Sequence, residues 1–367
     1  MSTKKDKFSL KDKLYMDLAL DLARAREGLT GTNPSVGCII VKNDKIISIG
    51  QTSYNGRPHA ETNAIRNTSD NLKNSTMYVT LEPCSHHGVT SPCTSAIIKS
   101  KIGKVIYSVI DIDKRVRGKT FKILNSKKIE VHVGLLKNKV NEFYKPYYYN
   151  RKKKLPFVNG KIAVAKNNLI YSKSKIKITN WRSDKFTHLL RYKNDSILIS
   201  YKTLNKDNPK LNCRLKNLEK FSPKRIILDN RLETNTKSYI FKTANKNNTI
   251  IFYNEAKKSK ILKFKKKIQI IKSKTNIGKQ FDIPIILKKL YNLGCRNILV
   301  EGGNDLTKYF LKKKIFNRFY LFKSPKTLSK FNEYKEFNGF NILKKNYKNK
   351  TKIKSNFGKD TITLYKN

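Results

Sequence analysis

Four residues in two short segments have the chemistry of a metal site. His59 and Glu61 stand in the run P-H-A-E, and Cys84 and Cys93 bound the run C-S-H-H-G-V-T-S-P-C. One imidazole and two thiolates are a ligand set suited to tetrahedral zinc, and three protein ligands leave the fourth position open for water. An open position is typical of a catalytic zinc site. Glu61, two residues after the histidine, adds a carboxylate beside it.

This spacing indicates a hydrolytic reaction. A histidine and a glutamate two residues apart, followed by Pro-Cys and a second cysteine, form the signature of zinc base deaminases, in which the glutamate is not a ligand and moves protons. That signature has two residues between its cysteines, whereas eight separate Cys84 from Cys93 here, His86 and His87 among them. We therefore expect Glu61 to be catalytic. A non-catalytic zinc module would instead leave Glu61 idle, so that Glu61→Gln would change nothing.

Length and composition set the scale of the protein. At about 100–200 residues per domain, 367 residues predict two domains. Hydrophobic residues make up 38% of the chain, enough for globular cores, and no apolar run reaches the roughly 20 residues of a membrane span. The five cysteines are an odd number, and no apolar leader follows the lysine-rich start. The sequence predicts a soluble, cytoplasmic protein whose thiols are buried or bind metal.

The chain is strongly basic, with a net charge of +54. Clustered lysines and arginines bind the phosphates of nucleic acids, so a base deaminase acting on RNA is one alternative. The lysines are spread through the whole chain, however, and are not gathered in one patch with stacking aromatics. We therefore expect a small-molecule substrate and no membrane or nucleic-acid partner, and the charge attracts anionic substrates. The chain could also form a homo-oligomer.

The first part of the chain alternates helices and strands, the pattern of a layered α/β domain. A helix is expected over 10–26, with Leu14, Leu18, Leu22 and Ala25 on one face. The other expected elements are strands over 36–42, 46–49, 76–81 and 105–110, and helices from about residue 60 and over 93–101.

The segment 144–156 mixes prolines, aromatics and basic residues, so we place a domain boundary there. The predicted domains are 1–146 and 147–367, and the second is also expected to be α/β. Its expected strands are 157–165, 196–200, 225–228, 249–253, 268–271 and 297–300, and its expected helices are 181–192 and 283–293.

Together these segments resemble the bifunctional deaminase/reductase family of riboflavin biosynthesis, the RibD family. The resemblance rests on N-P-S-V-G-C-I-I-V at 33–41, on H-A-E at 59–61, and on the cysteine segment at 80–93, whose long spacing is specific to that family among zinc deaminases. It covers nearly the whole chain and is stronger in the first half. It implies a cytidine-deaminase-like α/β/α layer domain followed by an α/β domain similar to dihydrofolate reductase.

In the first domain the resemblance implies Zn²⁺ on the three ligands and hydrolytic deamination of diaminohydroxyphosphoribosylaminopyrimidine to 5-amino-6-(5-phosphoribosylamino)uracil. Asn33 matches the position where related deaminases hold the base edge, although a turn explains it equally well. His86 and His87 either contact substrate or cap their loop. Residues 111–118, D-I-D-K-R-V-R-G, resemble a phosphate-facing loop, the alternative being a basic turn without function.

In the second domain the resemblance implies reduction of the ribosyl to the ribityl chain by NADPH. Residues 297–310 read as a buried strand, a glycine turn and a helix with Asn304 as its N-cap, a start that can bind phosphate through backbone N–H groups. Residues 203–214, T-L-N-K-D-N-P-K-L-N-C-R, match the family's T-V-L-A-D-D-P-x-L-T-x-R. Arg214 is expected to hold the substrate phosphate. Lys161 fits the lysine of the family's first strand in this domain, or is an exposed strand charge.

The match assigns two sets of contacts and shows three departures. The cofactor is expected to contact Val164, Lys177, Thr203, Asp207, Asn230, Gly303, Asn304, Asp305, Leu306, Thr307, Lys308 and Tyr309, and the substrate Lys175, Leu211, Arg214 and Glu301. The family's S-x-D-G-R/K reads A-K-N-N-L at 165–169, its S-x-W-I-T reads K-I-K-I-T at 175–179, and a later serine is Asn230. The missing Asp-Gly turn is expected to impair closure over the cofactor.

The favoured interpretation is a two-step enzyme, a zinc deaminase followed by an NADPH reductase. One alternative keeps the deaminase and treats the second half as a degenerate reductase that serves packing or dimerisation. The RNA deaminase alternative is disfavoured by the long cysteine spacing and by the reductase-like half.

Overall fold

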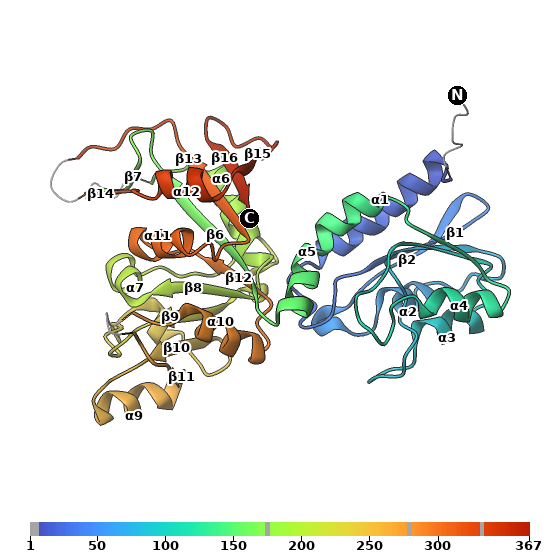
Figure 1. Cartoon of the computed structure of the whole chain (residues 1–367), viewed down its shortest axis with the longest axis horizontal. Coiled ribbons are helices and arrows are strands. Elements are labelled where there is room, and N and C mark those ends of the chain that lie inside the picture. The colour runs from blue at the N-terminus through green and yellow to red at the C-terminus, as the bar shows by residue number, and fades with distance from the viewer. Residues whose placement is uncertain (1–6, 173–176, 277–279, 331–333) are drawn as a thin grey trace. The chain divides into compact units, whose positions relative to one another are not determined.

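The computed structural model describes residues 7–172, 177–276, 280–330 and 334–367. The chain divides into two compact units, Met1–Lys154 and Leu155–Asn367, and each has its own hydrophobic core (Figure 1). The division lies a few residues beyond the predicted boundary at 146. The segment expected to be a linker is mostly helix α5 (Lys137–Lys153), which buries Tyr144 in the core of the first unit.

The first unit is built on one five-stranded sheet. Its elements are α1 (Leu10–Ala25), β1 (Gly37–Lys42), β2 (Lys45–Gln51), the 3-10 turn η1 (Tyr54–Gly56), α2 (Ala60–Arg66), β3 (Thr76–Leu81), α3 (Cys93–Lys99), β4 (Lys104–Val109), α4 (Lys119–Ser126), β5 (Glu130–Val133) and α5. The strand order is β2-β1-β3-β4-β5, with β3, β4 and β5 parallel and β1 antiparallel to both of its neighbours. Helices α1 and α5 cover one face, and α2, α3 and α4 the other (Figure 1).

The expected elements of this unit are present, but the face of α1 that carries Leu14, Leu18, Leu22 and Ala25 is not its buried face. Leu14 and Leu18 are 57% and 37% exposed. The buried residues of α1 are Tyr15, Met16, Ala19, Leu20 and Ala23. Ala19 and Ala23 have small side chains, so the helix lies very close to the sheet at these positions. A Cβ on Gly37 would lie 1.8 Å from the carbonyl oxygen of Ala19. Close packing against β1, and not the size of the leucines, therefore selects the face.

The second unit contains a nine-stranded sheet. Its elements are β6 (Phe157–Val164), β7 (Leu169–Ser172), α6 (Trp181–Tyr192), β8 (Ser196–Ser200), α7 (Tyr201–Asp207), the 3-10 turn η2 (Glu219–Phe221), β9 (Lys224–Leu228), α8 (Tyr239–Lys242), β10 (Thr249–Tyr253), α9 (Lys258–Lys267), β11 (Gln269–Lys272), α10 (Ile283–Asn292), β12 (Asn297–Val300), α11 (Asn304–Lys312), β13 (Arg318–Lys323), β14 (Tyr334–Glu336), α12 (Phe340–Asn346), β15 (Asn349–Lys352) and β16 (Thr361–Lys366). The strand order is β11-β10-β9-β8-β12-β6-β13-β16-β15, parallel from β11 to β13, and β7 pairs separately with β14.

All six strands predicted for this unit are present, but the strands after β12 were missed. Strands β13 and β16 complete the sheet beside β6, and β15 forms its edge. These strands carry basic residues at their ends or along an exposed edge, so the apolar runs typical of strands are interrupted. Their sequences are R-F-Y-L-F-K, T-I-T-L-Y-K and N-K-T-K. Because β6, β8, β9 and β12 are parallel, their carboxyl ends meet at one edge, where α/β sheets bind ligands.

No helix in the described ranges is both long enough and apolar enough to cross a membrane.

Candidate functional site

His59, Cys84 and Cys93 meet in the first unit. Their ligand atoms all lie within 4.8 Å of one another. Nδ1 of His59 lies 3.3 Å from Sγ of Cys93 and 3.5 Å from Sγ of Cys84. One nitrogen and two sulfurs at this spacing fit tetrahedral zinc with one position left for water. The predicted ligands are therefore close enough to hold a single ion.

Three elements place these ligands. His59 is the N-cap of α2, Cys84 lies just beyond β3, and Cys93 is the first residue of α3. The backbone N–H of Cys93 donates to Sγ of Cys84 at 3.2 Å. A hydrogen bond from the Cys93 thiol lowers the pKa of Cys84 to about 4, and His59 acts in the same direction. Cys84 is therefore held as a thiolate, the form that binds metal.

Glu61 stands beside this cluster in the first turn of α2 and is only 3% exposed. Burial raises the pKa of its carboxyl, and the side chain hydrogen-bonds with the Cys93 thiol. A raised pKa makes a carboxylate a stronger proton acceptor, and the protonated carboxyl can return the proton. Glu61 thus has the properties of a proton carrier at the cluster.

A cavity of about 80 Å³ lies beside the cluster and is lined by Glu61, Asn33 and His86 among others. Nδ2 of Asn33 also donates to the Gly56 carbonyl at 3.0 Å, so its side chain both lines the cavity and ties a turn. His86 lines the cavity, whereas His87 is exposed and is not among the lining residues of the described chain.

Residues 111–118 are fixed at this cavity by Glu82, which the sequence analysis did not single out. The Glu82 carboxylate accepts hydrogen bonds from the backbone N–H groups of Asp111 at 3.2 Å, Gly118 at 3.0 Å and Thr120 at 3.2 Å. Glu82 is 3% exposed, and burial raises its pKa. Glu82 stands two residues before the ligand Cys84, in the run L-E-P-C, and this position was the sequence feature that could have identified it.

A larger cavity, of about 500 Å³, lies at the carboxyl ends of the parallel strands of the second unit. Of the predicted contacts, it is lined by Thr203, Asp207, Asn230, Glu301, Gly303, Asn304, Asp305, Leu306 and Tyr309. A Cβ on Gly303 would lie 3.3 Å from Oγ1 of Thr203, so the glycine leaves room there for a ligand. Backbone room at the start of α11 suits a phosphate group, so these residues fit a nucleotide cofactor.

The other predicted contacts are not among the lining residues. Val164 and Thr307 are buried, Thr307 donating to the Gly302 carbonyl at 3.3 Å, and Lys177 and Lys308 are exposed. Leu211 is buried with a left-handed φ of 55°, and Arg214 is exposed. Lys175 lies outside the described residues.

The turn after β6 has two asparagines where the family has Asp-Gly, and the structure shows what each of them does. Asn168 adopts the left-handed conformation at φ 64°, which asparagine tolerates better than most residues. Asn167 donates Nδ2 to the Leu328 carbonyl at 2.7 Å and accepts from the Leu328 N–H at 3.3 Å. Two asparagines thus fill the places of Asp and Gly.

Helix α11 begins differently from the prediction. Gly303, and not Asn304, is its N-cap. The Asn304 side chain instead donates to the side chain of Asn338 and accepts from the Asn338 N–H at 3.4 Å. The glycine therefore leaves the first N–H groups of α11 without a side-chain cap.

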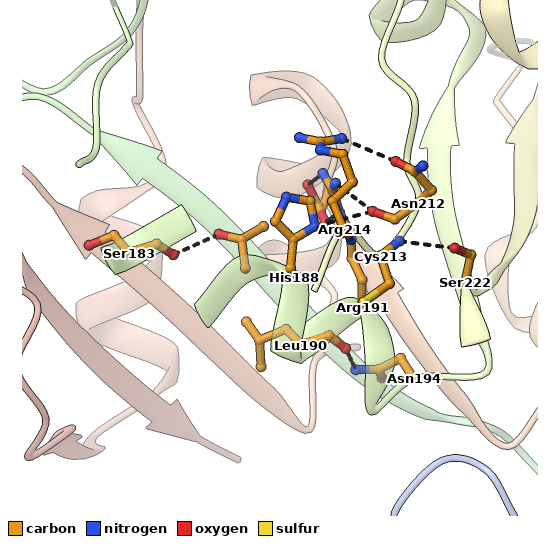
Figure 2. A network of polar contacts seen from close by, with 11 residues as sticks. Ser183, His188, Leu190, Arg191, Asn194, Asn212, Cys213, Arg214 and Ser222 are labelled. Atoms are coloured by element: carbon orange, nitrogen blue, oxygen red, sulfur yellow. Dashed lines mark hydrogen bonds and ion pairs between the residues drawn. The ribbon is translucent and has the colours of Figure 1, made fainter. Parts of the chain in front are cut away.

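Glu301 is held by an arginine that the sequence analysis missed. Arg191, on α6, donates to the two carboxylate oxygens at 2.7 and 2.9 Å, and Nη1 donates to the Asn212 carbonyl at 3.1 Å (Figure 2). Burial opposes ionisation of Glu301, but Arg191 outweighs it and lowers the pKa of the carboxyl. The run H-L-L-R gave the available signal, since it puts His188 and Arg191 on one helix face.

His188 orders the segment that carries Arg214. The backbone N–H of Arg214 lies 3.2 Å from Nδ1 of His188, and Nη1 of Arg214 donates to Oδ1 of Asn212 at 3.1 Å (Figure 2). Burial, with Arg191 and Arg214 nearby, lowers the pKa of His188 to about 4. The imidazole is therefore neutral at pH 7. Its Nδ1 faces both the Arg214 N–H and, at 3.2 Å, the Asn212 carbonyl, and the tautomer decides with which of the two it hydrogen-bonds.

Lys161 lines the same cavity as Glu301. It is therefore not simply a charged residue on the exposed side of a strand. Burial lowers the pKa of its ammonium group, and the Glu301 carboxylate opposes that change.

Comparisons with known proteins follow this division of the chain. Residues 160–362 match the family model described as the RibD C-terminal domain. Residues 9–109 match that of the cytidine and deoxycytidylate deaminase zinc-binding region. The first match covers more than half of the chain.

Full-length relatives match both units together. The riboflavin biosynthesis protein RibD of Aquifex aeolicus is 34% identical over 97% of this chain and 98% of its own, and that of Actinobacillus pleuropneumoniae is 31% identical over 96% and 94%. A diaminohydroxyphosphoribosylaminopyrimidine deaminase/5-amino-6-(5-phosphoribosylamino)uracil reductase from Thermotoga maritima, a solved structure, is 27% identical with a TM-score of 0.78 over 97% of this chain and 98% of that one. The chain belongs to the RibD family of bifunctional deaminase/reductase enzymes of riboflavin biosynthesis.

Proposed function

We propose that this chain deaminates diaminohydroxyphosphoribosylaminopyrimidine to 5-amino-6-(5-phosphoribosylamino)uracil and then reduces the ribosyl group to ribityl with NADPH. The observation that carries the proposal is the cluster of His59, Cys84 and Cys93 beside the buried Glu61, in a chain that also has a reductase cavity. The match to RibD proteins over 97% of the chain supports the presence of both activities in one chain.

In the deaminase site, His59, Cys84 and Cys93 would hold Zn²⁺. A bound zinc ion supplies Lewis-acid activation of water near neutral pH. Glu61 would carry two protons in turn: first one from the attacking water to the ring nitrogen, and then the hydroxyl proton of the adduct to the departing amine. One C–N bond breaks and one C–O bond forms, so water is consumed and ammonia released.

In the reductase site, the cofactor would lie along the 500 Å³ cavity of the second unit. The proposed contacts that line this cavity are Thr203, Asp207, Asn230, Gly303, Asn304, Asp305, Leu306 and Tyr309. The family match also assigns Val164, Lys177, Thr307 and Lys308, which do not line it, and Val164 and Thr307 are buried. Bound NADPH would supply a hydride equivalent, and C1′ of the ribosyl group is the carbon that is reduced. The C1′–O bond opens, and the ring oxygen takes up a proton. Lys161, whose pKa is lowered by burial, is suited to supply that proton.

Lys175, Leu211, Arg214 and Glu301 are the proposed substrate contacts in this half. Both oxygens of Glu301 accept from Arg191, so its carboxylate is fixed in orientation at the cavity wall. Arg214 is exposed and uses one guanidinium nitrogen on Asn212, which leaves its charge available to a phosphate. The intact turn at Asn167 and Asn168 weighs against the degenerate-reductase alternative.

We also propose that the protein works in the cytoplasm. All five cysteines are free thiols, and four of them are buried, which suits a reducing compartment. A phosphorylated substrate and a nicotinamide cofactor suit the same compartment.

Assaying the two reactions separately tests the proposal. With the diamino compound and no cofactor, we expect ammonia release that a zinc chelator abolishes. With the uracil compound and NADPH, we expect oxidation of the cofactor that the chelator leaves unchanged, and slower oxidation of NADH. Ammonia release without any cofactor oxidation would retain the deaminase and reject the reductase, whereas no ammonia release from zinc-loaded protein would reject the deaminase.

A further inference from the structure

Arg57 lines the deaminase cavity, but it is neither a proposed zinc ligand nor the proton carrier. It lies between η1 and α2, two residues before His59. Its Nη1 donates to Oγ1 of Thr90 at 2.8 Å and lies 3.5 Å from Nε2 of His59. Thr90 belongs to the long segment between the two cysteine ligands. A permanent cation therefore stands one side chain away from the metal ligands.

The carboxylates of this cavity, apart from the buried Glu61, already have partners. Glu82 accepts three backbone N–H groups. Asp111 accepts from Tyr147 at 3.0 Å and from the N–H of Asp113 at 3.0 Å. Asp113 binds the guanidinium of Arg115 at 3.0 and 2.7 Å. These acidic groups are therefore not available to neutralise a further cation.

The three arginines that line the cavity differ in what they contact. Arg115 is engaged by Asp113 through two hydrogen bonds. Arg151 lies over the ring of Tyr147, 5.4 Å from its centre, and its charge helps to stabilise the ionised carboxyl of Asp113. Arg57, unlike Arg115, forms no ion pair with any carboxylate of the described chain, and its two polar contacts both use Nη1. Its charge therefore lies at the cavity wall, beside the metal ligands, without a carboxylate partner among the described residues.

We propose that Arg57 binds the phosphate of the pyrimidine substrate in the deaminase site. This inference rests on the proposed function, which supplies a substrate with one phosphate. A guanidinium presents a planar fork of donors that matches phosphate geometry, and it is always charged. With the amine-bearing ring at the cluster, the ribosyl arm extends the phosphate away from the ring toward the neighbouring guanidinium.

A cycle of two substrates and two proteins tests the assignment. Deamination by wild type and Arg57→Gln is measured with the phosphorylated compound and with its dephosphorylated form, without cofactor. For the phosphorylated compound, Arg57→Gln is expected to raise KM about tenfold or more with kcat little changed. For the dephosphorylated compound it should change little, because the group that Arg57 binds is missing. Equal losses on both compounds would overturn the assignment.

Two further variants separate binding from structural effects. Arg66→Gln removes the same charge from an exposed position on α2 outside the cavity, and should leave KM unchanged. Thr90→Val removes the Arg57–Thr90 hydrogen bond but keeps the guanidinium, and should also retain low KM. If Thr90→Val reproduces the loss, or if Arg57→Gln loses zinc by metal analysis, Arg57 positions the loop or the ligands and the proposal is wrong.

Direct titration keeps this inference distinct from the proposed function. Calorimetry with ribose 5-phosphate uses proteins that all carry Arg214→Gln, which removes the phosphate contact proposed for the reductase half. Binding is expected with Arg57 intact and with Arg66→Gln, and is expected to weaken about tenfold with Arg57→Gln. Equal binding by all three proteins would overturn the role of Arg57 even if deamination is found. Failure of wild type to deaminate either compound would reject the proposed function, and the titration would still decide whether Arg57 holds phosphate.

Discussion

Arg191 and Glu301 form a two-point ion pair across the reductase half, at 2.7 and 2.9 Å, and their side chains are only 11% and 12% exposed. The two residues are 110 positions apart in the chain. The pair joins α6 to the end of β12, where the large cavity begins. The pair holds the Glu301 carboxylate in one orientation at the cavity wall, and it favours the ionised form over the protonated one.

Breaking one side of this pair should destabilise the protein strongly. Arg191→Met leaves Glu301 as an unpaired charge in a nearly buried place, which typically costs about 3–5 kcal/mol. Replacing both residues by Met should cost less than the sum of the single changes, because no charge is left unpaired. Urea unfolding measures all three variants, with Lys308→Met on the exposed side of α11 as control. Simple additivity would show that the pair contributes no coupling.

His188 should make stability depend on pH below neutrality. Its pKa is lowered to about 4 from an ordinary value of 6.5. Between these values the unfolded chain binds a proton that the folded chain does not, so the free energy of unfolding falls as the pH drops from 6.5 toward 4. His188→Gln keeps an acceptor for the Arg214 N–H and removes the titration. Denaturant unfolding at several pH values should give a flatter profile for the variant, and equal slopes would contradict the assignment.

Glu61→Gln should separate the two activities. The amide keeps the size of the side chain but cannot carry a proton, so deamination should fall by about 10²–10⁴-fold. Reduction of the uracil compound should be unchanged, and metal analysis should still find zinc, because Glu61 is not one of the clustered ligands. Thr62→Val, a neighbouring change on α2, is a control for local disturbance. Retained deamination in Glu61→Gln would favour a non-catalytic zinc module.

The two asparagines in the turn after β6 should respond differently to substitution. Asn168→Gly should be neutral or slightly stabilising, because glycine adopts the left-handed conformation freely. Asn167→Ala removes both hydrogen bonds to Leu328 and should cost about 1–3 kcal/mol. Thermal unfolding and the KM for NADPH measure both variants. If Asn167→Ala left both quantities unchanged, the turn would have no role in shaping the cofactor cavity.

The sequence predicts the parts of this protein whose signal is local. His59, Cys84 and Cys93 were found because metal chemistry restricts the residue types and because Pro-His-Ala-Glu and Pro-Cys are short runs. Strands such as β8, β10 and β12 were found because they are buried on both faces and read as continuous apolar runs.

The features that were missed depend on distant partners. Arg191 gains its role from Glu301, and Glu82 from N–H groups that follow β4, so neither is recognisable from its neighbours in sequence. The buried face of α1 is set by the close approach of Ala19 to Gly37, which no hydrophobic period reports. Asn168 takes the place of a glycine because the turn requires a backbone conformation and not a residue type.

The two reactions can be followed together in a single time course. Zinc-loaded protein is incubated with the diamino-pyrimidine phosphate and NADPH, and the pyrimidine products are identified by mass spectrometry over time. We expect the ribosyl-aminouracil phosphate to form first and the ribityl-aminouracil phosphate to follow, with one NADPH oxidised for each ribityl product and none for the deamination. Accumulation of the ribosyl compound alone would contradict the reductase, and reduction of the diamino compound before any deamination would contradict the order of the two steps.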